Sequence, residues 1–178
     1  MPMLRKLLLG LAVLLMLLLA AGLFLPQSAH VERSIVTSAP PERVFTLVDG
    51  FARFNEWSPW AELDPGTVYK YSGPPSGVGA RMEWSSQDSS VGSGSQEVIA
   101  IEPGRSVTNR LDFGPQGQAT ARIDVVPEGS GSRVTWSMDS SFENDYLGRY
   151  FGLFFDKLIG KDYEKGLAKL KTLAEAGP

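Results

Sequence analysis

The sequence contains no cysteine and a single histidine in 178 residues. Without cysteine the chain can form no disulfide, carries no thiol nucleophile and cannot be anchored as a lipoprotein. The histidine, His30, falls in the short segment 26–30 that we interpret as a tether, so neither a catalytic triad nor a multi-histidine metal site is expected. The motifs HExxH, GxSxG and GxxxxGK[ST] are also missing. We therefore expect no metal ion and no cofactor.

Basic residues are missing between Lys6 and Arg33, and the run LLLGLAVLLMLLLAAGLFL fills residues 7–25. An uncharged run of this length is enough for a helix to cross the hydrocarbon core of a bilayer. Because Arg5 and Lys6 precede it, the positive-inside rule keeps the N-terminus in the cytoplasm. Residues 1–27 are thus predicted to be a single-pass membrane anchor. Residues 28–178 form a domain on the outer side, such as the periplasmic face of a bacterial inner membrane.

A cleaved signal peptide would share several of these features. The basic start is present, and the small residues 20–22 would suit a cleavage site. The length of the apolar run favours the anchor, because the hydrophobic core of a signal peptide usually spans only about 7–15 residues. Both alternatives export the domain.

The charge balance narrows the choice of partner. Residues 1–27 hold two basic residues and no acidic one, so the net charge changes from −3 for the chain to −5 for residues 28–178. An acidic balance argues against nucleic acid as a partner and against electrostatic docking on anionic lipid. A domain of this length can bury a core of its own, and its oligomeric state is left open.

Short alternating runs separated by glycine-rich turns predict an antiparallel meander from residue 67 onwards. An earlier strand at residues 31–38 is followed by prolines that suit a first helical turn, and then by two short helices, before and after Gly50. A long helix is predicted over residues 146–176, with a kink at Gly160. Six strands are expected in the meander, at residues 67–73, 79–86, 94–104, 106–114, 118–129 and 132–142.

The later strands separate into an apolar and a polar face. Asn109 shares the apolar face with Leu111 and Phe113. A buried amide needs a partner, so Asn109 either binds a ligand or is satisfied by buried water or a strand edge. Arg81 and Glu83 alternate with apolar residues, and we interpret them as part of a solvated outer face. The alternative is a charged pair that faces the cavity, with Glu97 of the next strand near Arg81, and would indicate catalysis or ligand recognition.

The element order and five stretches resemble the helix-grip superfamily of START and pollen-allergen proteins (SRPBCC), in its polyketide cyclase/dehydrase branch. The stretches are SAPPERVFTLVDGFARFNEWSPW, GVGARMEW, IEPGRSV, GSRVTWSMD and IGKDYEKGLAKLK, and the resemblance covers roughly residues 31–175. It implies an α+β fold in which a curved antiparallel sheet of about seven strands grips the long C-terminal helix, with a cavity between them.

The resemblance also implies where a ligand would bind. Side chains from the short helices, the sheet and the long helix would line or seal the cavity and hold a small hydrophobic ligand: Phe54, Trp57, Trp60, Trp84, Asn109, Trp136, Met138, Phe151, Phe154, Phe155 and Leu158. Ordinary core packing is the alternative role for the tryptophans. No catalytic residue can be named from the spacing.

Three functions are compatible with such a container, because the superfamily hosts several activities on one fold. The leading hypothesis is a membrane-anchored binding domain for a lipid, isoprenoid or polyketide-like molecule. The alternatives are an enzyme of the polyketide cyclase or dehydratase type and a protein-interaction module with a closed core.

Overall fold

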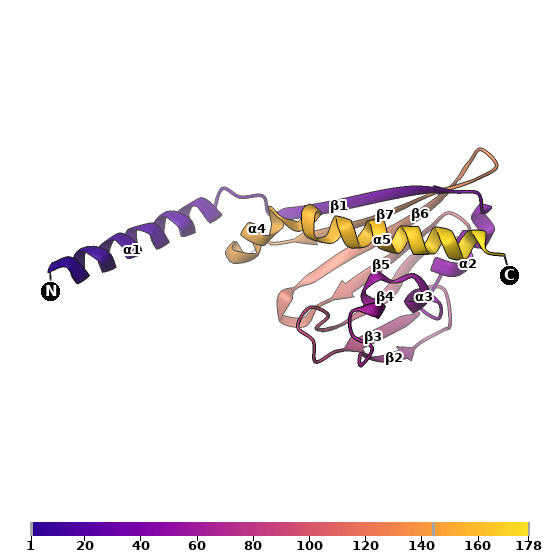
Figure 1. Ribbon diagram of the computed structural model, residues 1–178, viewed down its shortest axis with the longest axis horizontal. Helices are drawn as coiled ribbons and strands as arrows, with labels where there is room; N and C mark the ends of the chain where they lie inside the picture. The colour runs from indigo at the N-terminus through magenta and orange to yellow at the C-terminus, as the bar shows by residue number, and fades with distance from the viewer. Residues whose placement is uncertain (1, 144, 178) are drawn as a thin grey trace.

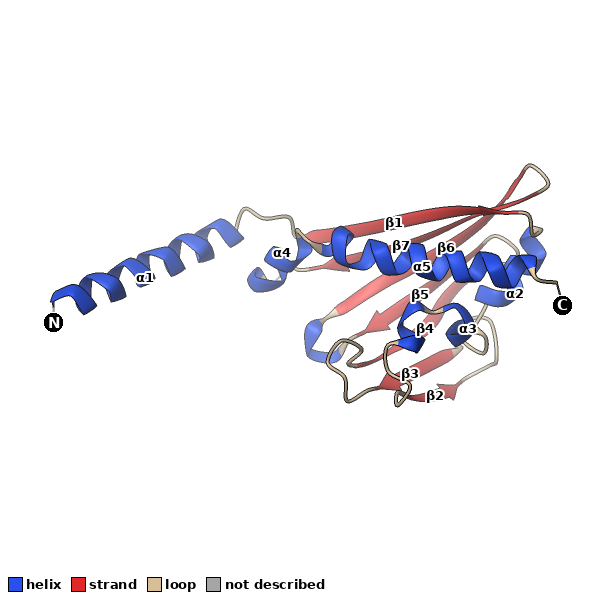
Figure 2. Cartoon of the chain, viewed as in Figure 1, coloured by secondary structure: helices blue, strands red, loops and turns tan. Residues whose placement is uncertain are grey.

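The computed structural model describes residues 2–143 and 145–177 (Figure 1, Figure 2). Helix α1 projects from one end of a domain in which a curved sheet faces a long C-terminal helix. The strands are β1 (Ser28–Thr37), β2 (Val68–Ser72), β3 (Arg81–Ser85), β4 (Ser93–Glu102), β5 (Ser106–Asp112), β6 (Gln118–Glu128) and β7 (Gly131–Ser141). The helices are α1 (Pro2–Gly22), α2 (Pro41–Val48), α3 (Phe54–Trp57), α4 (Tyr146–Gly152) and α5 (Phe155–Glu175), with short 3₁₀ turns η1 (Pro59–Glu62) and η2 (Gly114–Gln116).

The seven strands form one sheet in the order β1-β7-β6-β5-β4-β3-β2, and each neighbouring pair is antiparallel. Strands β2 to β7 are the predicted meander, and β1 pairs with β7 at one edge. The register aligns residues that face the same side in rows across the sheet. One row joins Val31, Met138, Ala121 and Asn109, from β1 to β5.

Helix α5 packs along β1 and also contacts β7, α2, α3 and η1, so it covers one half of the inner face of the sheet (Figure 1). Helix α2 has Pro41 in its first turn, where the missing backbone N–H costs nothing. Its apolar side chains Val44, Leu47 and Val48 are buried in the core. The other half of the inner face, on β2 to β5, lies away from α5.

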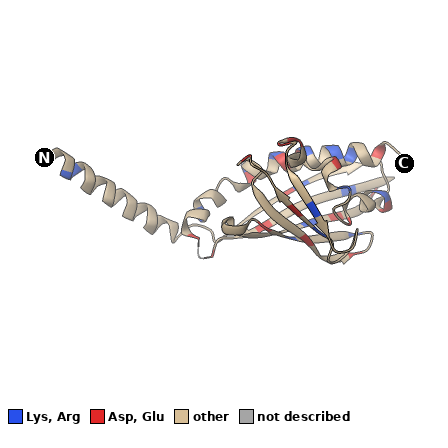
Figure 3. Ribbon diagram, turned by 90° about the horizontal axis from the view of Figure 1, so that it is seen from below, with Lys and Arg blue, Asp and Glu red and all other residues tan. Residues whose placement is uncertain are grey.

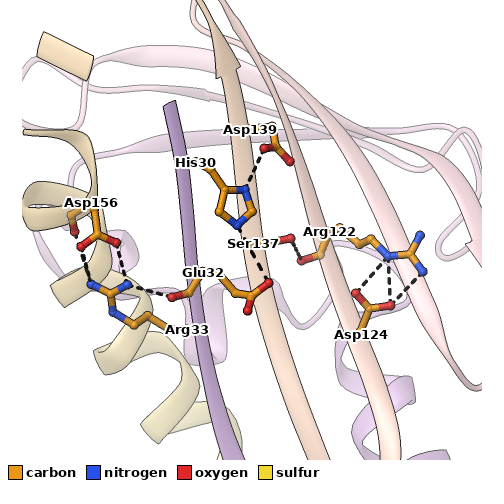
Figure 4. Close-up of polar contacts among 8 residues, drawn as sticks. All are labelled: His30, Glu32, Arg33, Arg122, Asp124, Ser137, Asp139 and Asp156. Atoms are coloured by element: carbon orange, nitrogen blue, oxygen red, sulfur yellow. Dashed lines mark hydrogen bonds and ion pairs between the residues drawn. The ribbon is translucent and has the colours of Figure 1, made fainter. Parts of the chain in front are cut away.

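The C-terminal helix is interrupted at residues 153–154, so the predicted kink at Gly160 is wrong. Gly160 instead lies where the side chain of Arg33 of β1 reaches across α5. Any larger residue would collide with the arginine here, because its Cβ atom would lie 2.0 Å from Nη2 of Arg33. The Arg33 Nε donates to Oε1 of Glu164 at 2.8 Å. Its Nη1 donates to Oδ1 of Asp156 at 2.7 Å (Figure 4). The same contact lowers the pKa of Asp156. The glycine thus allows one arginine to join the sheet edge to the helix.

Charged side chains of the central strands lie on the outer face, opposite α5. Nη2 of Arg81 is 3.1 Å from Oε1 of Glu83, and its Nη1 is 3.7 Å from Oε2 of Glu97, which confirms the solvated face predicted for this pair. His30 lies within β1 rather than in a tether, and its Nδ1 is 2.7 Å from Oδ1 of Asp139 on the same outer face (Figure 4).

Candidate ligand-binding site

The centre of the inner face carries short or polar side chains, which we call the central patch. Each is more than nine-tenths buried, and strand register brings them together from β4, β5, β6 and β7: Gln96, Asn109, Ala119, Ala121 and Ser140. Alanine and serine fill less space here than the larger side chains of the neighbouring rows. The patch is the part of the inner face best suited to receive an apolar molecule with a polar group.

Asn109 contributes a fully buried oxygen atom to the patch. Its Oδ1 is buried and has no hydrogen-bond partner among the described residues. Its cross-strand neighbours are Val98 on β4 and Ala121 on β6, which offer only apolar side chains. An unpaired buried acceptor costs about 1–3 kcal/mol. Asn109 therefore has a buried oxygen that can accept a hydrogen bond from a ligand or from an ordered water.

One end of the space beneath α5 is closed by an aromatic cluster. Trp136 stacks on Tyr163 of α5 with ring centroids 3.8 Å apart. The ring of Trp57 contacts the Trp136 ring edge-on, with centroids 5.2 Å apart. The Trp57 Nε1 donates to the Leu47 carbonyl oxygen at 3.1 Å. Gly166 allows this packing, because a Cβ there would lie 2.8 Å from the Trp136 ring.

Several residues predicted to line the cavity belong to this cluster, and their burial shows whether they are core or rim residues. Trp57 and Trp136 are 1% and 4% exposed, so they are core residues in this structure. Phe54 is buried beside Trp57, whereas Trp60 packs at the rim of the cluster and is half-buried. Burial also raises the pKa of the Tyr163 phenol, which keeps it neutral at pH 7.

The opposite end is less closed. Inner-facing Trp84, Leu111 and Phe113 are only partly buried there, although they pack against the core. A hollow of about 430 Å³ reaches Trp84 and Phe113 but is lined mainly by outer-face residues such as Lys70, Arg81 and Glu83. Another of about 440 Å³ lies beside Phe51 and Tyr71. Neither hollow is lined by a residue of β6, β7 or α5, so neither is the cavity predicted between the sheet and the C-terminal helix.

The predicted helix residues divide into two groups. Phe155 is partly buried and meets Phe142 edge-on at 6.3 Å. Phe151, Phe154 and Leu158 are 69%, 59% and 60% exposed, so the expectation that they face the sheet is wrong. The physical reason is local: α4 turns Gly148 and Arg149 inward, and the interruption that follows sends the aromatic stripe outward.

The chemistry of the inner wall is neutral. Within the described strands β2 to β7, the positions that face α5 carry no charged side chain. The polar groups there are those of Gln96, Asn109, Ser132 and Ser140, the indole N–H groups of Trp84 and Trp136, and the tyrosine hydroxyls of β2. Met138 is buried in the same row as Asn109. Such a wall can bind and orient an apolar molecule, but it presents no acid–base pair.

Sequence reasoning missed two residues of the patch, Ser140 at the end of β7 and Gln96 on β4. The run Val98–Ile101 is continuously apolar, so alternation does not define the facing of this strand. The structure has a register shift between Val98 and Ala100, which leaves Ile99 out of the pairing and exchanges the faces on either side of it. A bulge of this kind has no sequence signal in a run of similar side chains.

Comparisons with known proteins agree with this geometry. The sequence profile of the family described as "Polyketide cyclase / dehydrase and lipid transport" matches residues 28–175. The chain belongs to this family. No curated protein matches it at a significant level. Family and fold together suggest either binding of a hydrophobic ligand or a polyketide cyclase-like function.

Solved structures confirm the predicted helix-grip fold. A solution structure from Thermobifida fusca has 18% identity and a TM-score of 0.64, with 82% of this chain and 92% of that chain covered. The di-domain ARO/CYC BexL from the BE-7585A biosynthetic pathway has 17% identity and a TM-score of 0.59, with 85% and 52% covered. Ara h 8.0201 has 11% identity and a TM-score of 0.59, with 84% and 99% covered. At such identities the similarity concerns the fold alone.

Proposed function

We propose that this protein is a membrane-anchored binding domain for a small hydrophobic molecule, such as a lipid, an isoprenoid or a polyketide-like compound. Residues 7–25 cross the membrane in this proposal, and the domain lies on the outer side. The ligand lies between the central patch and the first turns of α5. The observation that carries the proposal is the buried, unpartnered Oδ1 of Asn109 in an otherwise neutral and largely apolar wall.

The wall also indicates the chemistry of the ligand. Transfer of apolar surface out of water provides about 25 cal/mol per Å² before the costs of association. Oδ1 of Asn109 needs a donor, so a ligand with a hydroxyl group on an apolar skeleton fits better than a pure hydrocarbon. A carboxylate fits poorly, because the inner positions of β2 to β7 carry no cation and Arg33, on the same face of β1, is already paired with Asp156 and Glu164.

The composition of this inner wall favours ligand binding over catalysis. A cyclase or dehydratase needs a group that moves a proton during the reaction. The charged residues Arg81, Glu83 and Glu97 are paired on the outer face. Tyr163 is stacked on Trp136, with a pKa raised by burial. We therefore place the ligand, and not a reaction, at the centre of the function.

Native mass spectrometry of the full-length chain, released gently from membranes and followed by organic extraction, tests the proposal. We expect a retained small molecule, and we expect Asn109→Val to lose it while Thr108→Val, on the opposite face of β5, keeps it. A chain that retains nothing and also fails to bind an apolar fluorescent probe would contradict the proposal and favour a closed interaction module.

A further inference from the structure

An apolar stripe on α4 and the start of α5 is turned away from the domain. Leu147, Phe151, Phe154 and Leu158 are spaced by four, three and four residues, which places them on one side of a helix. With Leu153 at the interruption they form a surface, here called the α4 surface, in which each side chain is more than half exposed. A water-exposed surface of this composition indicates a missing apolar partner.

The position of the α4 surface is fixed by contacts to the end of α1. Arg149 is 3% exposed, and its Nη1 donates to the carbonyl oxygens of Gly22 at 3.1 Å and Leu23 at 3.4 Å. Its Nη2 donates to the Glu143 carbonyl oxygen at 2.6 Å. The hydroxyl of Tyr150 donates to the carbonyl oxygen of Leu18. Helix α4 is therefore held beside the point where α1 ends (Figure 1).

Exposed charge is absent from α4 but not from the start of α5, where Asp156 and Lys157 precede Leu158. Among residues 146–155 the only charged side chain is Arg149, and backbone carbonyl oxygens and the face of the Tyr146 ring surround it. Figure 3 shows α1 without charge beyond its first turns. Leu23 and Phe24, which link α1 to the domain, are also exposed. Apolar surface thus continues from α1 through the linker to α4.

We propose that the α4 surface lies in the bilayer that α1 spans, at the level of the headgroups and upper acyl chains. The inference rests on the anchor assigned under the proposed function. Tyr146 and Arg149 would sit at the interface, where amphipathic aromatic and basic groups are usual. The domain would then be held against the membrane by two elements rather than by one flexible tether.

Single cysteines in the cysteine-free full-length chain test this directly. Phe151→Cys, Leu14→Cys in α1 and Val78→Cys in the β2–β3 loop each receive a nitrobenzoxadiazole label after reconstitution into phosphatidylcholine vesicles. Val78 is an exposed apolar residue like Phe151, so it is the matched control. We expect the label at residue 151 to have blue-shifted emission and to be quenched by nitroxide lipids. Residue 14 should behave in the same way, and residue 78 should remain in water.

Each other outcome overturns the inference in a distinguishable way. A water-exposed label at residue 151 with a shielded label at residue 14 means that the anchor stands and α4 does not enter the bilayer. Water-exposed labels at both positions mean that the anchor itself fails. A label at residue 151 that is shielded only at high protein-to-lipid ratio, without nitroxide quenching, means that a second copy of the chain covers the surface. Circular dichroism in the near ultraviolet confirms that each variant is folded.

Discussion

Replacing Asn109 by valine should stabilise the ligand-free protein while abolishing ligand retention. The amide oxygen of Asn109 is buried without a partner, between Val98 and Ala121 on neighbouring strands. Valine is close in size to asparagine and removes both polar atoms. A residue selected for fold stability alone would not leave this acceptor unpaired, so the gain in stability measures what the binding site costs.

The magnitude follows from two effects with the same sign. Removing an unpaired buried acceptor gains about 1–3 kcal/mol, and valine suits a strand better than asparagine by up to about 1 kcal/mol. We expect a net gain of about 1–4 kcal/mol in the free energy of unfolding. For a domain of this size, each kcal/mol raises Tm by about 2–4 °C. The control Thr108→Val, on the outer face of the same strand, should change stability by less than about 0.5 kcal/mol.

The assay is thermal unfolding of the full-length chain in detergent, followed by the near-ultraviolet circular dichroism of its tryptophans. The protein must first be stripped of ligand, because a bound ligand stabilises the native state by an amount that grows with the ratio of free ligand concentration to Kd. With ligand added, the wild type should gain stability and Asn109→Val should not. A ligand-free Asn109→Val that is less stable than the wild type would refute the reasoning, because the oxygen would then be making a favourable interaction.

Three further predictions concern packing, pH and the α4 contact. Gly166→Ala should lower the free energy of unfolding by about 1–3 kcal/mol, because its Cβ would press on the rigid Trp136 ring; an unchanged urea midpoint would contradict this. The Glu175 carboxylate accepts a hydrogen bond from the Ser38 backbone N–H at 2.9 Å, which lowers its pKa below the ordinary value of 4.5. Its contribution is present at neutral pH and is lost as pH falls through the lowered pKa. Urea midpoints of the wild type and Glu175→Gln should therefore differ at pH 7 and converge in acid, whereas a constant difference would exclude the linkage. Arg149→Met should leave several buried carbonyl oxygens unpaired and speed hydrogen exchange in α4, but not in β6. Equal protection in the variant would show that the arginine does not hold α4.

The sheet could be predicted from the sequence because its strands alternate. In β5 to β7 one face is apolar and the other is polar, and burial in the structure follows the same period of two. The position of Asn109 on the inner face was therefore predictable, whereas the absence of a partner for its oxygen was not. Hydrogen bonding of a buried amide depends on several strands and on α5 together, and spacing along one strand carries no such information.

The C-terminal helix shows what periodicity leaves open. The stripe that contains Phe151 and Leu158 was correctly identified as apolar and wrongly placed against the sheet. A helical period specifies that one face avoids water, but it does not say whether protein or lipid covers that face. The buried position of Arg149 was equally hidden, because a lone arginine in an apolar helix usually indicates a solvated side.

The two proposals connect through the direction of the strands. Strand β1 starts near α1. Its residue Ala29 lies in the same cross-strand row as Ser140 and Ala119, and the next inner-facing residue, Val31, lies in the row of Asn109. Gly152 at the end of α4 lies beside Ala29, since a Cβ there would be 3.8 Å from it. The central patch is thus nearest to α4, whereas the stacked Trp136 and Tyr163 close the far end. If the α4 surface lies in the bilayer, the less closed end of the domain faces the lipid. A hydrophobic ligand could then pass from the membrane to Asn109 with little exposure to water.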